Sequence, residues 1–369
     1  MKKTILTILA GAGCALASCA QPAPSGNYSL SVTFPAEAEA DDYMAYIVDV
    51  DNGAKIDSVI VADNKALFSG KIDKPVLARV MLENDRVGTF ILEPADIVFD
   101  PATKEAKGGT LNAKMDDINK KFGEVVSRFR ALPRDSTFEA KAGALQAEYE
   151  KLNADALKEN ADNPIGYYLF INMAGSLDEP QLDEALKQYP QFASSQKVAG
   201  FKKMFVQRRE TSVGQPYKDF AVTFEGKTTK LSEMLKKGRY TLVDFWASWC
   251  GPCRRETAVI KDLLKEYGPK GLDVVGVAVW DEPDNTRKAI EELALPWPQI
   301  LNAQSVPTEL YGIAGIPTII IIDPDGKIVS RDKQDEELRA DVAACFPANN
   351  PLHPIYEAMS RHLCDTVSL

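Results

Sequence analysis

Two cysteines, Cys250 and Cys253, are separated only by Gly251 and Pro252 in the stretch WASWCGPCRRE. A thiol becomes a good nucleophile when it loses its proton, and two thiols at this spacing can join reversibly as an intramolecular disulfide. The same spacing also occurs in half of a tetrahedral metal site. Three interpretations therefore arise: a redox pair, a metal site, or two structural thiols.

The elements around the cysteines favour the redox pair. The run TLVDFWA, residues 241–247, predicts a buried strand, and an amphipathic helix follows from the apolar stripe Val259, Ile260, Leu263, Leu264 and Tyr267. Cys250 then lies at the helix N-terminus, where unpaired N–H groups and the helix dipole favour a thiolate. We predict that Cys250 is the nucleophile and that the more buried Cys253, one turn further on, closes the disulfide.

A metal site lacks ligands near this motif. Structural zinc needs four nitrogen or sulfur ligands, whereas the sequence has only two histidines, His353 and His362, both in the C-terminal tail. Two buried structural thiols would not need Gly-Pro between them. We therefore expect no metal and no other cofactor.

Length and charge bound the class of protein. A chain of 369 residues is long enough for about two or three domains. Its formal net charge of -10 argues against a nucleic-acid partner, which needs a concentrated basic face. We expect a soluble, acidic protein.

The periodicity of apolar residues divides the chain into regions. Short alternating runs such as YSLSVTF predict a small antiparallel β-sandwich over residues 27–110. Apolar residues three or four apart predict a helical region over residues 111–213, with Asn163-Pro164 beginning one helix. From residue 214 to residue 346, strands alternate with helices, which is typical of an α/β sheet. Residues 347–369 form a C-terminal extension.

The N-terminus has the features of an export signal. Two lysines precede an apolar run that is too short to span a bilayer comfortably, and small residues precede Cys19. The stretch Leu16-Ala17-Ser18-Cys19 resembles the bacterial lipobox, which implies that residues 1–18 are a signal peptide and that Cys19 is acylated. Residues 19–26 then form a flexible tether. An ordinary signal peptide cut nearby and a retained anchor are the alternatives.

Residues 214–346 resemble the thioredoxin fold, and within it the extracytoplasmic thiol-disulfide oxidoreductases of TlpA/ResA type. The resemblance is carried by VDFWASWCGPCRRE, by GIPT at residues 315–318, and by the intervening segment WDEPDNTRKAIEELALPWPQ. The preceding region resembles an N-terminal domain of unknown function that occurs in bacterial lipoproteins. The resemblance covers about a third of the chain, and its motifs are specific in combination.

The resemblance implies roles for further residues. Asp244 corresponds to a buried carboxylate that takes the proton from Cys253, and Pro317 corresponds to a cis-proline whose loop faces the cysteines. The backbone of Ile316 would then pair with an extended substrate. The substrate-binding candidates are Trp249, Gly251, Pro252, Ile316 and Pro317. Relatives often carry proline where this chain has Ala258, so we expect a straighter active-site helix here.

Two further cysteines lie near the C-terminus. Cys345 and Cys364 are predicted to form a structural disulfide in an oxidising compartment. Free thiols and a metal site with His353 and His362 are the alternatives.

The sequence as a whole favours a lipid-anchored enzyme on the periplasmic side of a bacterial membrane. It would reduce disulfides in protein substrates and be recharged by a membrane electron-donor protein, as the resemblance implies. An oxidase or isomerase would run the same exchange in another direction. A thiol peroxidase on the same fold and a binding lipoprotein without catalysis are the remaining alternatives.

Overall fold

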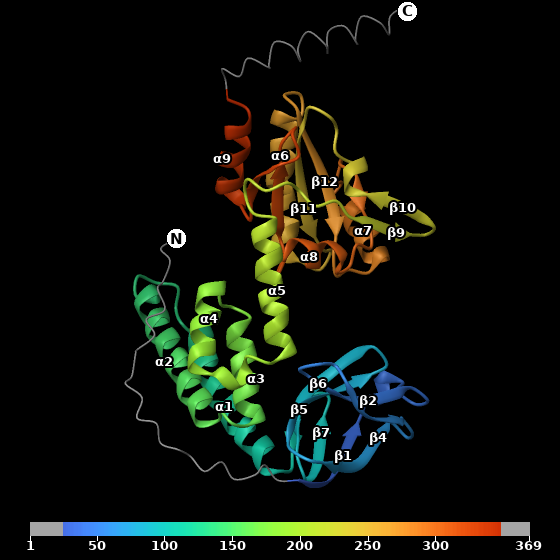
Figure 1. Cartoon of the computed structure of the whole chain (residues 1–369), viewed down its shortest axis with the longest axis vertical. Helices are drawn as coiled ribbons and strands as arrows, with labels where there is room; N and C mark the ends of the chain where they lie inside the picture. The colour runs from blue at the N-terminus through green and yellow to red at the C-terminus, as the bar shows by residue number, and fades with distance from the viewer. Residues whose placement is uncertain (1–24, 348–369) are drawn as a thin grey trace, which may run out of the picture. The chain divides into compact units, whose positions relative to one another are not determined.

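The computed structural model describes residues 25–347, and these form two compact units (Figure 1). One unit contains the described residues up to Ser176 together with Glu184–Lys197. The other contains Leu177–Asp183 and the described residues from Val198 onward. The predicted signal peptide, residues 19–24 of the predicted tether with Cys19, and the extension after residue 347 lie outside the described residues.

The first unit contains a β-sandwich of two four-stranded sheets. One sheet has the order β4-β1-β7-β8 and the other has the order β3-β2-β5-β6. The strands are β1 (Gly26–Thr33), β2 (Met44–Asp49), β3 (Lys55–Ile60), β4 (Lys65–Ile72), β5 (Val76–Leu82), β6 (Asp85–Leu92), β7 (Asp96–Asp100) and β8 (Glu105–Lys107).

The alternation read from the sequence gives the sandwich its core. Tyr28, Leu30 and Val32 of β1 are each at most 5% exposed, and they pack with residues of both sheets in one apolar cluster. One strand pair departs from the antiparallel prediction, because β7 runs parallel to β1. The chain enters β7 from β6 in the other sheet, so the pair is not a hairpin and its direction is free to differ.

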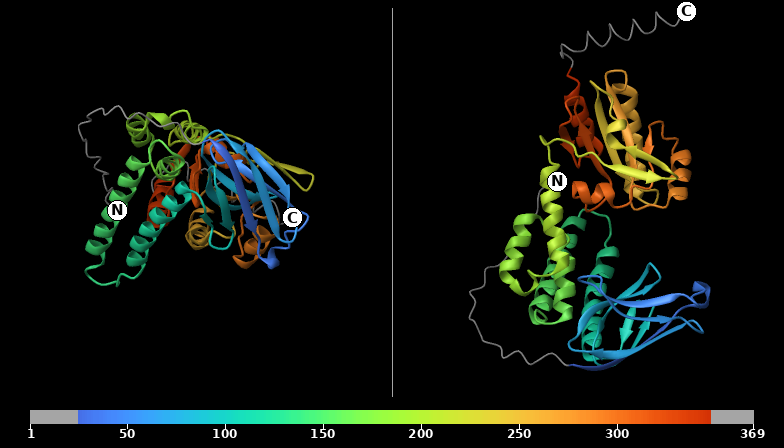
Figure 2. Two further views of the ribbon diagram at one scale, coloured as in Figure 1. Left: turned by 90° about the horizontal axis from the view of Figure 1, so that it is seen from below. Right: turned by 45° about the vertical axis from the view of Figure 1, so that its right-hand side comes forward.

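Helices follow the sandwich, as the change of period predicted. They are α1 (Thr110–Arg130), α2 (Phe138–Glu159), α3 (Pro164–Ala174), α4 (Glu179–Gln188) and α5 (Gln196–Glu210). Asn163 caps α3, its side chain accepting the N–H of Ile165 at 2.9 Å. Figure 2 shows α1 and α2, in teal and green, as a long antiparallel hairpin.

The apolar stripes of this hairpin are buried only in part. Met115 and Ile118 are buried, but Phe129 and Tyr149 are 42% and 41% exposed. Phe122 instead packs on Tyr149 with their ring centroids 4.7 Å apart. The far end of the hairpin is therefore held by contacts between its own two helices.

The second unit is built on a five-stranded sheet with the order β13-β12-β11-β14-β15. The strands of this sheet are β11 (Tyr240–Trp246), β12 (Leu272–Ala278), β13 (Gln299–Ile300), β14 (Thr318–Ile322) and β15 (Ile328–Arg331). The helices that follow α5 in this unit are α6 (Gly251–Tyr267), α7 (Pro283–Glu292), α8 (Val306–Tyr311) and α9 (Asp335–Cys345). A separate hairpin consists of β9 (Ala221–Phe224) and β10 (Lys227–Lys230).

Two apolar layers cover the five-stranded sheet. Leu242 of β11 packs with Ile260 of α6 and Leu338 of α9 on one face. Val243 of β11 packs with Tyr311 of α8 and Val222 of β9 on the other. Helices on both faces of a mixed sheet are the α/β thioredoxin fold that was predicted, and the sandwich with its helical segment precedes it.

Three short elements escaped the sequence analysis: β10, β13 and α8 have only four, two and six residues. Single turns of 3-10 helix lie at Ala36–Ala38, Pro190–Phe192 and Leu231–Glu233. Across residues 25–347, no helix has the length and apolar character that crossing a bilayer requires.

Candidate active site

The cysteine pair lies where β11 ends and α6 begins. β11 is the central strand of its sheet, and six of its seven residues are buried. Cys250 is the N-cap of α6 and Pro252 occupies its first turn, where a missing N–H costs nothing. The strand and the helix thus hold the cysteines at one edge of the sheet.

Cys250 and Cys253 form a disulfide, and their Cα atoms are 5.3 Å apart. Cys250 is 4% exposed and Cys253 is 0% exposed. The backbone N–H of Cys253 donates to the sulfur of Cys250 at 3.2 Å. The Cys250 sulfur is therefore the more accessible of the two and receives an N–H group of the first turn of α6.

A second loop reaches the same edge of the sheet. β14 pairs antiparallel with β11, with Thr318 opposite Phe245, so the residues just before Thr318 lie beside the end of β11. The Ile316–Pro317 peptide bond in this loop is cis. Ile316 is half-buried and packs against the cluster that contains both cysteines.

The residues predicted to bind substrate differ in exposure. Trp249 is 61% exposed, and its indole N–H donates to the backbone oxygen of Trp280 at 2.9 Å. Gly251 and Pro252 are exposed, whereas Pro317 is half-buried. Around a nearly buried disulfide, the edge of the sheet thus offers an apolar and accessible rim.

Asp244 lies in the middle of β11 and is 1% exposed. It alternates with Leu242 and Trp246, so its side chain is on the face that α6 covers. Its Oδ1 has no hydrogen-bond partner within residues 25–347. Burial raises the pKa of Asp244 from 3.8 to about 8, and the negative charge of Glu256 adds to this rise.

Glu256 is a site residue that the sequence analysis missed. It lies on α6 one turn after Cys253, and both belong to the buried stripe of the helix, with Glu256 3% exposed. Its Oε1 accepts the backbone N–H of Asp335 at 2.9 Å, and burial raises the pKa of its carboxyl. A glutamate at a stripe position of an otherwise apolar helix face was the available signal.

The predicted second disulfide lies partly outside the described residues, because Cys364 follows residue 347. Cys345 ends α9 and is half-buried, and its thiol donates to the backbone oxygen of Asp341 at 3.3 Å. Burial raises the pKa of this thiol to about 11. Within residues 25–347, no group of three or more His, Cys, Asp or Glu side chains has the geometry of a metal site.

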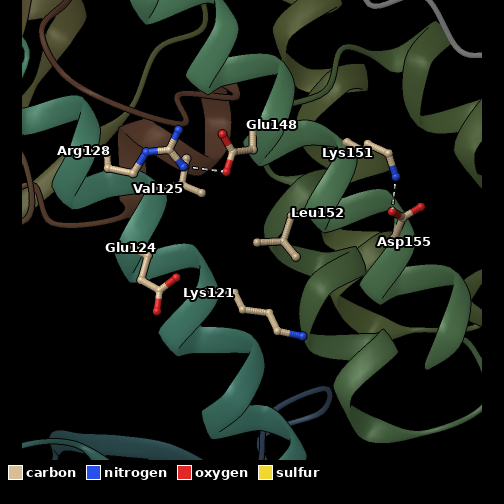
Figure 3. A pocket seen from close by; sticks show the side chains of 8 residues that line it. All are labelled: Lys121, Glu124, Val125, Arg128, Glu148, Lys151, Leu152 and Asp155. Carbon is tan, nitrogen blue, oxygen red and sulfur yellow. Dashed lines mark hydrogen bonds and ion pairs between the residues drawn. The ribbon is translucent and has the colours of Figure 1, made fainter.

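A groove in the other unit lies between α1 and α2 and contains no cysteine (Figure 3). Its lining is charged, and part of that charge is paired: Arg128 with Glu148 at 2.7 Å and Lys151 with Asp155. The groove offers no nucleophile for exchange with a disulfide. The redox chemistry of the described residues therefore belongs to the unit with the five-stranded sheet.

A closed CxxC disulfide at a helix N-terminus, beside a cis-proline loop on a thioredoxin-like sheet, defines a thiol-disulfide oxidoreductase. Comparison with known families agrees with this class. The model of the AhpC/TSA family matches residues 213–331. The model of a domain of unknown function (DUF4369) matches residues 28–117.

Individual relatives narrow the class. The thiol-disulfide oxidoreductase ResA of Geobacillus thermodenitrificans is 30% identical over 125 residues, which are 34% of this chain and 71% of that protein. ResA of Bacillus thuringiensis strain Al Hakam is 27% identical over 128 residues, which are 34% of this chain and 73% of that protein. The chain belongs to the ResA family of thiol-disulfide oxidoreductases, and this confirms the resemblance read from its motifs.

A solved structure is also similar to this chain. The thioredoxin domain of a thiol-disulfide oxidoreductase from Bacteroides vulgatus is 31% identical, with a TM-score of 0.34. The match covers 37% of this chain and 99% of that one.

Proposed function

We propose that this enzyme reduces disulfides of protein substrates outside the cytoplasm, with Cys250 as nucleophile and Cys253 as resolving thiol. The observation that carries the proposal is the position of the pair. Cys250 lies at the N-terminus of α6 with a backbone N–H 3.2 Å from its sulfur, and Cys253 is fully buried behind it. Hydrogen bonding and the helix dipole favour a thiolate at Cys250 once the disulfide is opened.

The exchange then proceeds in two balanced steps. The Cys250 thiolate attacks one sulfur of the substrate disulfide, forms a mixed disulfide and releases the other substrate sulfur as a thiolate. Cys253 loses its proton and attacks the Cys250 sulfur, which releases the second substrate thiolate and leaves the enzyme oxidised. Two electrons pass to the substrate, and a thiol donor must return them.

Asp244 serves as the proton acceptor for Cys253 in this scheme. A carboxyl with a pKa near 8 can hold or release a proton at neutral pH, where an ordinary aspartate is already ionised. Glu256 keeps that pKa high by its charge. The pair thus supplies a base whose strength suits a thiol.

The rim of the disulfide would bind an extended segment of the substrate. Trp249, Gly251 and Pro252 offer exposed apolar surface, and the loop of Ile316 and Pro317 lies at the same edge of the sheet. Pairing through backbone groups would tolerate many sequences. This suits an enzyme that acts on protein disulfides.

Location and electron supply rest on the N-terminal sequence and the family. A lipid on Cys19 would anchor the protein to the periplasmic side of a bacterial membrane. A membrane protein that relays electrons would then recharge the dithiol, because the compartment itself is oxidising. Metabolic labelling with a radioactive fatty acid tests the anchor. Cys19→Ala should abolish incorporation, whereas Cys14→Ala, a change at the cysteine within the predicted signal peptide, should leave it unchanged.

Reduction of insulin by a thiol donor tests the catalytic proposal. Cys250→Ser should abolish turnover, and Cys253→Ser should accumulate a mixed disulfide that resolves slowly. Cys345→Ser is the matched control, because that cysteine lies outside the site, and it should retain the wild-type rate. Equal rates for wild type and Cys250→Ser would overturn the proposal.

Direction of exchange is tested separately by the reduction potential. A potential close to that of thioredoxin, about -270 mV, supports a reductase, whereas a value near -120 mV supports an oxidase. Equilibration with glutathione or dithiothreitol buffers, read by tryptophan fluorescence, measures it. Trp249 directly precedes Cys250 in the sequence, so its fluorescence is a suitable reporter.

A further inference from the structure

Asp281 is a buried carboxylate that the exchange mechanism above does not use. It is 5% exposed and lies between the end of β12 and the start of α7. β12 runs parallel to β11, with Ala278 opposite Trp246, so the segments after both strands emerge at the same edge of the sheet. Asp281 therefore meets the segment that leads to Cys250.

The carboxylate binds that segment directly. Its Oδ2 accepts the backbone N–H of Ser248 at 2.7 Å, and its Oδ1 accepts the Ser248 hydroxyl at 2.8 Å. Oδ2 also accepts the hydroxyl of Thr286 from α7 at 2.7 Å. Both oxygens of a buried carboxylate are thus occupied, and two of the three contacts go to a single residue close to the nucleophile.

Neighbouring contacts join the same two segments. The Trp249 indole donates to the backbone oxygen of Trp280, and Gln304 donates to the backbone oxygen of Asp281 at 2.8 Å. Arg254 of α6 also contacts this segment: its guanidinium donates to the backbone oxygen of Ser248 at 3.5 Å and to the carboxylate of Glu292 at 2.9 Å. Arg255 of the same helix lies close to Gly251. The segment from Ser248 to Cys250 is therefore held mainly from the β12–α7 side.

These contacts bear on the reactive sulfur. Cys250 is anchored by its N–H to the backbone oxygen of Ala247 at 3.1 Å, and its own sulfur accepts the N–H of Cys253. A segment that shifted at Ser248 would move this sulfur away from the first turn of α6. The field of a helix terminus falls off within one turn, so a small displacement weakens it.

We propose that Asp281 is a positioning residue for thiol–disulfide exchange, which holds Ser248 and Trp249 so that the Cys250 sulfur stays at the N-terminus of α6 when the disulfide opens. This inference rests on the proposed role of Cys250 as nucleophile. The negative charge of Asp281 would by itself oppose a thiolate, so geometry and charge act in opposite directions. Variants can separate the two effects.

Asp281→Asn keeps the shape and removes the charge. Its amide oxygen can accept from Ser248 N–H and Thr286, and its amide nitrogen can donate to the Ser248 hydroxyl. Asp281→Ala removes all three contacts. Positioning therefore predicts that only the alanine variant raises the pKa of Cys250, by about half a unit, since a helix terminus contributes about 0.3–1 kcal/mol.

The measurement is the rate of alkylation of Cys250 by iodoacetamide in the reduced full chain, between pH 5 and pH 10, followed by peptide mass mapping. Asp284→Ala is the matched control. Asp284 is an exposed carboxylate in the first turn of α7, and it pairs with Arg287. This control should leave the pKa of Cys250 unchanged. Ser248→Ala removes one contact and keeps the N–H, so a smaller rise is expected.

Each outcome has a separate meaning. An unchanged pKa of Cys250 in a folded Asp281→Ala protein overturns the inference, and so does an equal rise in Asp281→Asn. If Asp281→Ala does not fold, the absence of any rise in Ser248→Ala overturns it. A wild-type Cys250 with the ordinary thiol pKa of about 8.5 would instead count against the proposed function itself.

Discussion

Asp244 and Glu256 are acidic residues in places where a charge is costly. Asp244 is 1% exposed between apolar residues of β11, and Glu256 occupies the buried stripe of α6. Burial is the main cause that raises the pKa of each of these two carboxyls. Burial of these carboxyls therefore lowers stability, and it provides a proton acceptor that works near neutral pH.

Stability should fall with rising pH because of Asp244. Its pKa is about 8 in the folded chain and near 3.8 in the unfolded chain. The folded state thus holds the proton more tightly, so its contribution is complete below pH 3.8 and is lost as pH rises through about 8, with a slope of up to about 1.4 kcal/mol per pH unit.

Asp244→Asn should remove this slope in the oxidised protein. Urea unfolding between pH 4 and pH 9 measures the difference from wild type, and the variant should gain relative stability toward high pH. Parallel profiles for the two proteins would show that Asp244 titrates normally.

Glu256→Gln should lower the pKa of Asp244, because it removes a negative charge that raises it. We expect a fall of roughly one unit. The 13C shift of the Asp244 carboxyl carbon in a pH titration measures it. Glu266→Gln, an exposed change on the same helix, should leave that titration in place.

The first turn of each helix has free backbone N–H groups that need an acceptor, and α3 and α1 find it in different ways. Asn163 caps α3 from the adjacent sequence position, a pattern visible in the sequence. α1 is capped differently: Glu93, which follows β6, accepts the N–H groups of Leu111 and Asn112 at 2.9 Å each. A carboxylate that is distant in the sequence thus caps α1, because the residue before this helix, Gly109, has no side chain.

Glu93→Ala should destabilise the unit that contains the sandwich by about 2 kcal/mol, since the N–H groups of Thr110, Leu111 and the buried Asn112 lose their acceptor. Glu93→Gln keeps one acceptor oxygen and should cost less. Chemical denaturation measures both, with Glu105→Ala as an exposed control on β8. A cost equal to that of the control would mean that the cap contributes nothing.

The whole molecule consists of two units with separate apolar cores. One core belongs to the sandwich, and the others line the two faces of the five-stranded sheet. The cysteine pair belongs to the second unit alone. Redox state should therefore act on one unit and spare the other.

Calorimetry should resolve two unfolding transitions in the oxidised protein. Reduction of the Cys250–Cys253 bond should lower the free energy of unfolding of the unit with the five-stranded sheet by at most about 2 kcal/mol, because the closed loop is short. The transition of the unit with the sandwich should not change. Cys253→Ser should reproduce the shift without reductant. Movement of both transitions by equal amounts would contradict the expectation that reduction acts on one unit.

Local patterns in the sequence were enough for much of this protein. Alternation at Tyr28, Leu30 and Val32 predicted the sandwich, the period of α6 predicted the helix behind Cys250, and Asn163 predicted the start of α3. These properties depend on residues a few positions apart, which set the buried face of a strand or helix directly. The resemblance carried by the motifs added Asp244 and the cis bond at Pro317.

Tertiary structure alone decided the rest. Four features join residues that are distant in the chain. They are the parallel pairing of β7 with β1, the cap that Glu93 provides for α1, the effect of the Glu256 charge on the pKa of Asp244, and the hydrogen bonds from Ser248 to Asp281. No local period encodes which distant group removes water from a carboxylate or supplies its hydrogen bonds. Desolvation and long-range pairing depend on the packed chain, and they set the chemistry of the groups around the disulfide.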